Sequence, residues 1–192
     1  MRQKHIFLAV VFALCSGVAA PGLASNEFKA AGALLVSGEG QSLQVLLVRH
    51  HSRSWYEMPG GRRQFASAGE GAQDRVMETA YETAIRECHE ESRGVLSLVL
   101  LRNSIDQSHQ LRDGGFVYFV GTIDWIPADT LRQVTVPRGA GPLGEIADYA
   151  WVDVDHVLVS AGDMVTDSEG RSIRVRPQLS ARLLRARGKG WF

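Results

Sequence analysis

The chain of 192 residues is long enough for one globular domain with a short appendage. Hydrophobic residues make up 45% of it and charged residues 22%, which is typical of a globular protein and excludes a disordered chain. The formal net charge is zero, so the composition does not favour a stable nucleic-acid partner.

The first 24 residues have the three-part pattern of a secretory signal peptide. Arg2 and Lys4 precede an apolar run over residues 6–14, and small residues follow as far as Ala24. We therefore expect a signal peptide at residues 1–24 and an exported protein, periplasmic or secreted. The apolar run is short for a membrane span, so we expect none after cleavage, with an uncleaved anchor helix as the alternative.

Removal of this segment changes the charge and the cysteine count. Arg2 and Lys4 are its only charged residues, so the remainder carries 19 basic and 21 acidic residues. Cys15 is also lost, which leaves Cys88 as the only cysteine. A single thiol makes no intramolecular disulfide, and we expect Cys88 to be a small buried apolar side chain rather than a reactive nucleophile.

The rest of the chain alternates strand patterns with two helix patterns. Thr79 and Glu82 form a capping box at the start of the first helix. Turn residues stand at Asp113-Gly114-Gly115, and a hairpin is expected around Ser168-Glu169-Gly170. The predicted helices cover residues 80–92 and 178–187, and the predicted strands cover residues 28–36, 43–48, 95–101, 115–123 and 149–154. This order predicts an α/β (α+β) sandwich.

Three carboxylates gather on the first predicted helix. At about 100° per residue, Glu87, Glu90 and Glu91 share an arc of roughly 100°. Like charges this close repel, so the cluster costs stability unless a cation neutralises it. Ligands that are all oxygen favour Mg²⁺, Mn²⁺ or Ca²⁺ over zinc. The alternative is a solvated acidic helix face.

The same stretch resembles the signature of the Nudix hydrolase family, G-x5-E-x7-R-E-U-x-E-E-x-G-U, in which U is aliphatic. Residues 86–91 match R-E-U-x-E-E, and Glu78 stands eight residues before Arg86, as in the signature. Met58-Pro59-Gly60-Gly61 is similar to the Pro-Gly-Gly that often opens it. The resemblance covers roughly residues 28–160. It implies a Nudix hydrolase domain at residues 25–192, an α/β/α sandwich with a mixed sheet and a central catalytic helix.

Two departures from the signature stand out. Gly61 lies 17 residues before Glu78, where the signature expects six, so about eleven residues are inserted after the glycine loop. This insertion bears on whether the loop still reaches the metal. The glycine after the paired acids also comes one place late, at Gly94, which should alter only the exit of the helix.

The resemblance implies a metal-dependent hydrolase that splits a diphosphate linkage in a small-molecule, nucleotide-like substrate. The catalytic residues would be Arg86 with Glu87, Glu90 and Glu91. The three acids and the backbone carbonyl of Gly61 would hold Mg²⁺ (or Mn²⁺). Arg86 and Glu78 would form a structural ion pair.

Family members often place a further acid outside the signature, as a general base or an additional metal ligand. Glu145 is our candidate, because it follows the glycine-rich stretch of residues 139–144, which can form a loop that reaches the helix. Asp113, in the Asp-Gly-Gly turn, is its rival.

Other interpretations stay open at this point. The chain could be a non-catalytic Nudix-fold module that senses a nucleotide, or a membrane-tethered protein that uses its acids structurally. Six polar residues outside the signature could contact substrate phosphate, although solvated loop positions are favoured for them: His50, His51, Arg53, His109, Arg112 and Arg138. The substrate and the oligomeric state are not predicted.

Overall fold

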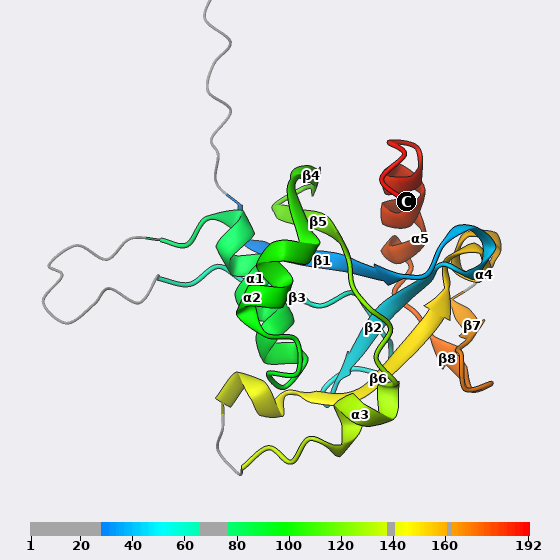
Figure 1. Cartoon of the computed structure of the whole chain (residues 1–192), viewed down its shortest axis with the longest axis horizontal. Helices are drawn as coiled ribbons and strands as arrows, with labels where there is room; N and C mark the ends of the chain where they lie inside the picture. The colour runs from blue at the N-terminus through cyan, green and yellow to red at the C-terminus, as the bar shows by residue number, and fades with distance from the viewer. Residues whose placement is uncertain (1–27, 66–76, 138–140, 161–162) are drawn as a thin grey trace, which may run out of the picture.

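The computed structural model describes residues 28–65, 77–137, 141–160 and 163–192 (Figure 1). The predicted signal peptide at residues 1–24, Cys15, and most of the insertion after Gly61 lie outside the described residues. Within the described chain, no helix combines the length and the hydropathy needed to cross a membrane.

A six-stranded mixed sheet forms the middle layer, with the strand order β4-β5-β1-β2-β6 and with β3 paired to β1. The strands are β1 (Ala30–Ser37), β2 (Gln44–His50), β3 (Gly60–Arg62), β4 (Ile105–Asp113), β5 (Phe116–Thr122) and β6 (Ile146–Asp153). Strands β1 and β5 are parallel, and the other pairs are antiparallel. The first residues of β1 pair with β3 and its last residues pair with β2.

Helices cover both faces of this sheet, as Figure 1 shows for α1 and α2 on one side and α5 on the other. The first face carries α1 (Ala80–Glu91), α2 (Leu98–Ser104) and α3 (Ala128–Gln133). The second face carries α4 (Val154–Val159), α5 (Gln178–Arg187) and the hairpin of β7 (Met164–Thr166) and β8 (Ser172–Arg174). Two short 3-10 helices, η1 (Gly40–Ser42) and η2 (Gly141–Gly144), lie in connections.

Each face of the sheet has its own hydrophobic core. Neighbouring residues of β1 point to opposite faces, so Leu35 packs under α1 while Leu34 packs under α5. Both are fully buried, which explains why β1 is a continuous apolar run rather than an alternating one. The predicted mixed α/β sandwich is therefore confirmed.

Helix α1 begins where the sequence predicts. The hydroxyl of Thr79 accepts a hydrogen bond from the Glu82 backbone N–H at 3.2 Å, and the Glu82 carboxylate accepts one from the Thr79 N–H at 2.7 Å. These two bonds satisfy amide groups that the first turn of a helix leaves without partners. Helix α5 and the β7–β8 hairpin also lie where they were predicted.

The strand expected over residues 95–101 is wrong, because this apolar run forms α2. Ser97 begins that helix by accepting a hydrogen bond from the Leu100 N–H at 3.1 Å. A short apolar run does not by itself distinguish a strand from a helix. The strand that precedes the Asp113 turn is β4, an edge strand whose mostly exposed polar residues carry no hydrophobic alternation.

The exit of α1 explains the displaced glycine. Arg93 has a φ of 55° and is the only non-glycine residue of the described chain in the left-handed region. Its N–H donates to the Glu90 carbonyl, and the Gly94 N–H donates to the His89 carbonyl, both at 2.9 Å. This is the bond pattern of a Schellman cap, with arginine at the position where glycine is usual.

The side chain of Arg93 offsets the strain of its backbone. Its guanidinium donates to the carbonyls of Arg132 at 3.0 Å, Val134 at 3.2 Å and Ile146 at 2.7 Å. Arg93 therefore ties the end of α1 to the connection between α3 and β6, the segment that carries Glu145.

This arrangement predicts different stabilities for two variants of Arg93. Arg93→Ala removes the three hydrogen bonds and should lower the free energy of unfolding by about 2 kcal/mol. Arg93→Gly removes the same bonds but accepts a positive φ freely, so it should be about 1 kcal/mol more stable than Arg93→Ala. Urea denaturation of both variants measures the difference. Two equally stable variants would show that the backbone of Arg93 carries no strain.

Candidate active site

Helix α1 turns two of its three signature acids inward. Glu87 is 9% exposed and Glu91 is 3% exposed, whereas the side chain of Glu90 is 20% exposed. Ala84 and Cys88 of the same helix are fully buried in the core beneath it. A solvated acidic face is therefore wrong for Glu87 and Glu91, which lie between the helix and the rest of the protein.

One guanidinium group joins the acids of this site. Arg86 donates from Nε to Glu78 at 2.7 Å, and from Nη1 to both Glu87 and Glu90 at 2.8 Å. Its Nη2 donates to Glu78 at 3.0 Å and to the carbonyl of Arg62 at 2.9 Å. The ion pair between Arg86 and Glu78 is thus present, and the same side chain also contacts two of the expected metal ligands.

Glu78 connects the two ends of the insertion. Its carboxylate accepts from the Gln64 N–H at 3.1 Å, and its own N–H donates to the Gln64 carbonyl at 3.0 Å. Phe65 and Met77 form an antiparallel bridge next to this pair. The insertion therefore begins and ends at adjacent points of the domain. Despite its length, β3 stays next to α1.

The glycine loop lies directly against the acids. The Gly60 N–H donates to the Glu91 carboxylate at 2.8 Å. A side-chain carbon at Gly61 would come within 2.3 Å of a Glu87 carboxylate oxygen, so any larger residue there would push this carboxylate aside. The inserted residues have not removed this loop from the acids.

His50 is a site residue that the sequence analysis assigned to a solvated loop. Its Nε2 lies 2.9 Å from a carboxylate oxygen of Glu91, and its side chain is 13% exposed. A signal for it was available, since Leu46 and Val48 of β2 lie under α1 and strand alternation places His50 on the same face. Burial raises the pKa of Glu91, and the contacts with His50 and the Gly60 N–H oppose this rise.

The site holds more negative than positive charge. Burial raises the pKa of Glu87 to about 7, with repulsion from Glu91 and Glu90 adding to it and Arg86 opposing it. Glu78 and the three helix acids face a single guanidinium group, that of Arg86, and the imidazole of His50 contacts Glu91. No three carboxylates of the described residues already converge as a metal shell, because Arg86, His50 and the Gly60 N–H each hold one or more of them.

The two candidates for a further acid lie on different sides of the molecule. Glu145 is exposed, it follows η2, which lies against α1, and its carbonyl accepts from the His51 N–H at 3.1 Å. Asp113 accepts from Arg182 of α5 at 3.1 Å, on the opposite face of the sheet. The backbone of Glu145 therefore lies next to the end of β2 that carries His50, whereas Asp113 is turned away from the acid cluster.

The other polar candidates are dispersed. His109 and Arg112 lie on the edge strand β4, where the ring of His109 stacks on Trp191 with centroids 4.8 Å apart. His51 is exposed, and Arg138 lies outside the described residues. Arg53 forms an ion pair with the buried Glu57, close to the glycine loop.

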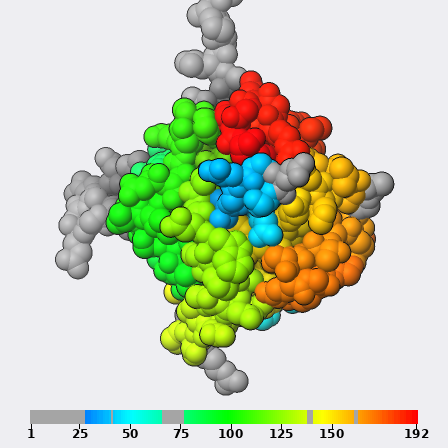
Figure 2. All heavy atoms as spheres, turned by 45° about the vertical axis from the view of Figure 1, so that its right-hand side comes forward, coloured from blue at the N-terminus to red at the C-terminus, as the bar shows by residue number. Residues whose placement is uncertain are grey.

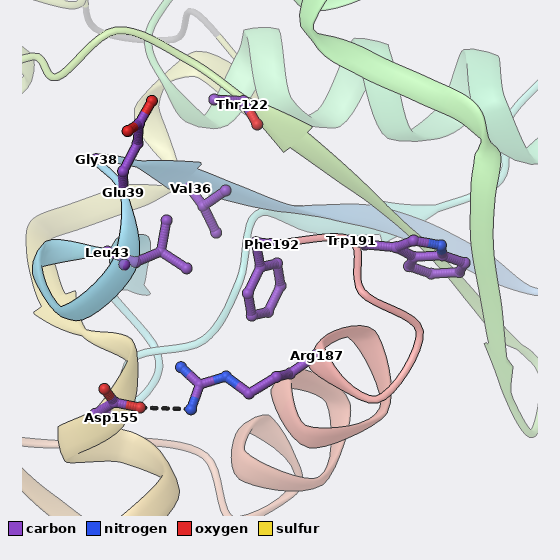
Figure 3. Close-up of a pocket in the computed structure, with 10 residues that line it drawn as sticks. Val36, Gly38, Glu39, Leu43, Thr122, Asp155, Arg187, Trp191 and Phe192 are labelled. Carbon is purple, nitrogen blue, oxygen red and sulfur yellow. Dashed lines mark hydrogen bonds and ion pairs between the residues drawn. The ribbon is translucent and has the colours of Figure 1, made fainter.

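A pocket of about 590 Å³ lies on the α5 side, where the C-terminal segment packs beside the β1–β2 turn (Figure 2). Figure 3 shows Val36, Leu43 and Phe192 around it, with Arg187 paired to Asp155 at one side. None of the predicted site residues lines this pocket. The acid cluster is therefore separate from it.

Known proteins resemble this chain in two comparisons, one of sequence families and one of solved structures. The family model described as NUDIX domain matches residues 27–170. A C. elegans Ap4A hydrolase structure is similar at 14% identity, with a TM-score of 0.42 over 86% of this chain and 99% of that chain. The NUDIX domain of Shewanella oneidensis NrtR, complexed with ADP ribose, is similar at 15% identity, with a TM-score of 0.48 over 85% and 88% of the two chains. No curated protein matches the sequence. At these identities the structural likeness concerns the fold alone.

The raised pKa of Glu87 predicts a pH-dependent effect of Glu87→Gln in metal-free buffer. The folded protein holds the proton of Glu87 up to about pH 7, whereas a glutamate in an unfolded chain loses it near 4.5, so the wild type loses stability between these values. The amide does not titrate. The stability of Glu87→Gln relative to the wild type should therefore increase from pH 4.5 to 7 and stay level above. Urea denaturation with EDTA measures it, and a difference that is the same at pH 5 and pH 8 would contradict the burial argument.

Proposed function

The chain belongs to the Nudix family, and we propose that it is a hydrolase that uses a divalent cation to split a diphosphate linkage in a small nucleotide-like substrate. The observation that carries this proposal is the burial of Glu87 and Glu91 under the Gly60-Gly61 loop. Burying carboxylates in a cluster that lacks enough cations costs stability, so the arrangement points to a ligand that supplies positive charge.

The donor set fits a hard divalent cation. Glu87, Glu90, Glu91 and the carbonyl of Gly61 offer only oxygen, which suits Mg²⁺ or Mn²⁺ better than a metal that prefers nitrogen or sulfur. When bound, such an ion neutralises phosphate charge and makes a water more acidic. Glu87 and Glu90 would turn toward it from Arg86, which keeps Glu78 as its partner.

The chain's own residues have distinct tasks in this proposal. Arg86 positions the acids and, through the Arg62 carbonyl, holds β3 against α1. The imidazole of His50 and the N–H of Gly60 both contact the carboxylate of Glu91 and orient it. Glu145 is exposed, and its carbonyl accepts from the His51 N–H. Its carboxylate would be the general base that takes a proton from the attacking water. The products would be a nucleoside monophosphate and the phosphorylated remainder of the substrate.

We also propose that residues 1–24 are a signal peptide that is removed when the protein is exported. The basis is the N-terminal charge and hydropathy pattern. Mass spectrometry of the protein from the extracytoplasmic fraction tests this. A full-length chain confined to the cytoplasm would reject it.

The proposed chemistry predicts which helix acids are needed for turnover. Glu90→Gln and Glu91→Gln each remove a charged ligand while preserving size, so each should lower kcat by about 10²-fold or more. The measurement is product formation, identified by mass, from a panel of nucleoside triphosphates, dinucleoside polyphosphates, nucleotide sugars and capped RNA with Mg²⁺ or Mn²⁺.

Glu82→Gln is the matched control for these variants. It makes the same change on the same helix, and glutamine still completes the capping box, so its rate should equal that of the wild type. Wild-type rates for both acid variants would refute the assignment of Glu90 and Glu91. Substrate binding without turnover by the wild type would favour a sensor module instead.

The position of Glu145 predicts a second contrast between two acids. Glu145→Gln should lower kcat by about 10²-fold if the carboxylate accepts the proton of the attacking water. Asp113→Asn should leave kcat unchanged, since Asp113 contacts Arg182 on the other face of the sheet. Steady-state kinetics with a saturating metal concentration measure both. An unchanged kcat for Glu145→Gln would remove it from the reaction.

A further inference from the structure

Two arginines share one buried glutamate beside the glycine loop. Glu57 is 6% exposed and forms ion pairs with Arg53 and with Arg176, whose Nη1 donates to it at 2.7 Å. The arginine side chains are 38% and 37% exposed. One carboxylate against two guanidinium groups leaves a net positive charge at the surface.

The backbone holds Arg176 in this position. The Tyr56 N–H donates to the Arg174 carbonyl at 2.7 Å, and the Arg176 N–H donates to the Tyr56 carbonyl at 2.9 Å. The side chain of Gln178 accepts from Nε of Arg176 at 3.1 Å. Arg176 follows residue 170, where the family match ends, so this part of the cluster comes from the chain's own C-terminal segment.

The cluster borders the acids of α1. Glu57 precedes Gly60 by three residues, and the Gly60 N–H contacts Glu91. The Arg53 N–H donates to the carbonyl of His50, whose ring also contacts Glu91. The charge of Arg53 is close enough to oppose the rise that burial causes in the pKa of Glu91.

We propose that Arg53 and Arg176, held by Glu57, form an anion subsite that binds the non-bridging oxygens of a substrate phosphate next to the metal-binding acids. A guanidinium offers parallel N–H donors that match two phosphate oxygens, and both arginines keep donors beyond those that Glu57 uses. The identity of the anion as a phosphate of the substrate rests on the proposed function.

Single glutamine variants test the subsite by removing one guanidinium at a time and leaving the other paired with Glu57. Arg53→Gln and Arg176→Gln should each weaken the binding of inorganic tripolyphosphate, measured by calorimetry in EDTA, by about tenfold. In turnover assays each should raise KM by a similar factor and change kcat little. Arg174→Gln is the matched control, because Arg174 lies two residues away and pairs with Asp163 instead. It should bind tripolyphosphate as the wild type does.

Thermal unfolding of each variant verifies the fold, and Arg53→Gln tests the subsite even if Arg176→Gln unfolds. Unchanged tripolyphosphate binding in both variants, or equal weakening in Arg174→Gln, would overturn the subsite. Arginine-dependent binding by a wild type that hydrolyses no substrate of the panel would support the subsite and reject the proposed hydrolase. Hydrolysis with KM unchanged in both variants would reject the subsite alone.

Discussion

The geometry of the acid cluster depends on how one guanidinium group distributes its donors. Arg86 bonds Glu78, Glu87, Glu90 and the Arg62 carbonyl at once, so α1, β3 and the base of the insertion meet at a single side chain. A buried ion pair often contributes little net stability, because desolvation offsets the attraction. The importance of Arg86 is therefore geometric: its planar fork keeps like-charged groups at set positions where they would otherwise repel.

Two of the helix acids lie in a buried environment, which disfavours the ionised form of a carboxylate. Glu87 and Glu91 lie under a loop whose glycines allow the backbone to approach their carboxylates directly. In the proposed function, the same burial that raises the pKa of Glu87 would strengthen the binding of a cation, because a counter-charge is worth more in a medium of low polarity than in water. The cost of burying these carboxylates and the proposed affinity for a cation would therefore have the same physical origin.

A rigid helix and the ends of several strands surround this charge. The capping box begins α1, its apolar residues pack on the sheet, and Arg93 ties its exit to the segment before β6. The end of β2 brings His50 to Glu91, and the carbonyl of Glu145, just before β6, accepts from the N–H of the neighbouring His51. Residues in such loops can vary, while the helix keeps the three acids at fixed positions relative to one another.

The features that arise from local interactions could be predicted from the amino-acid sequence alone. The capping box, the arc of three acids, the spacing of Glu78 to Arg86 and the two buried strands before them are all readable within a few residues, because helix and strand periodicity act over that range. Local patterns gave a wrong prediction at residues 98–101, because an apolar run of this length suits either a strand or a helix and its neighbours decide between them.

The distant residues that join the acids are set by the folding of the chain in three dimensions. His50 meets Glu91 across the interface between β2 and α1, Arg176 reaches Glu57 from 119 residues away, and Asp113 is drawn to Arg182 on the opposite face. The insertion leaves the glycine loop in place because Gln64 pairs with Glu78 at its base. These contacts depend on strand order, register and the choice of face, which are set by packing between segments far apart in the chain rather than by the residues beside each side chain.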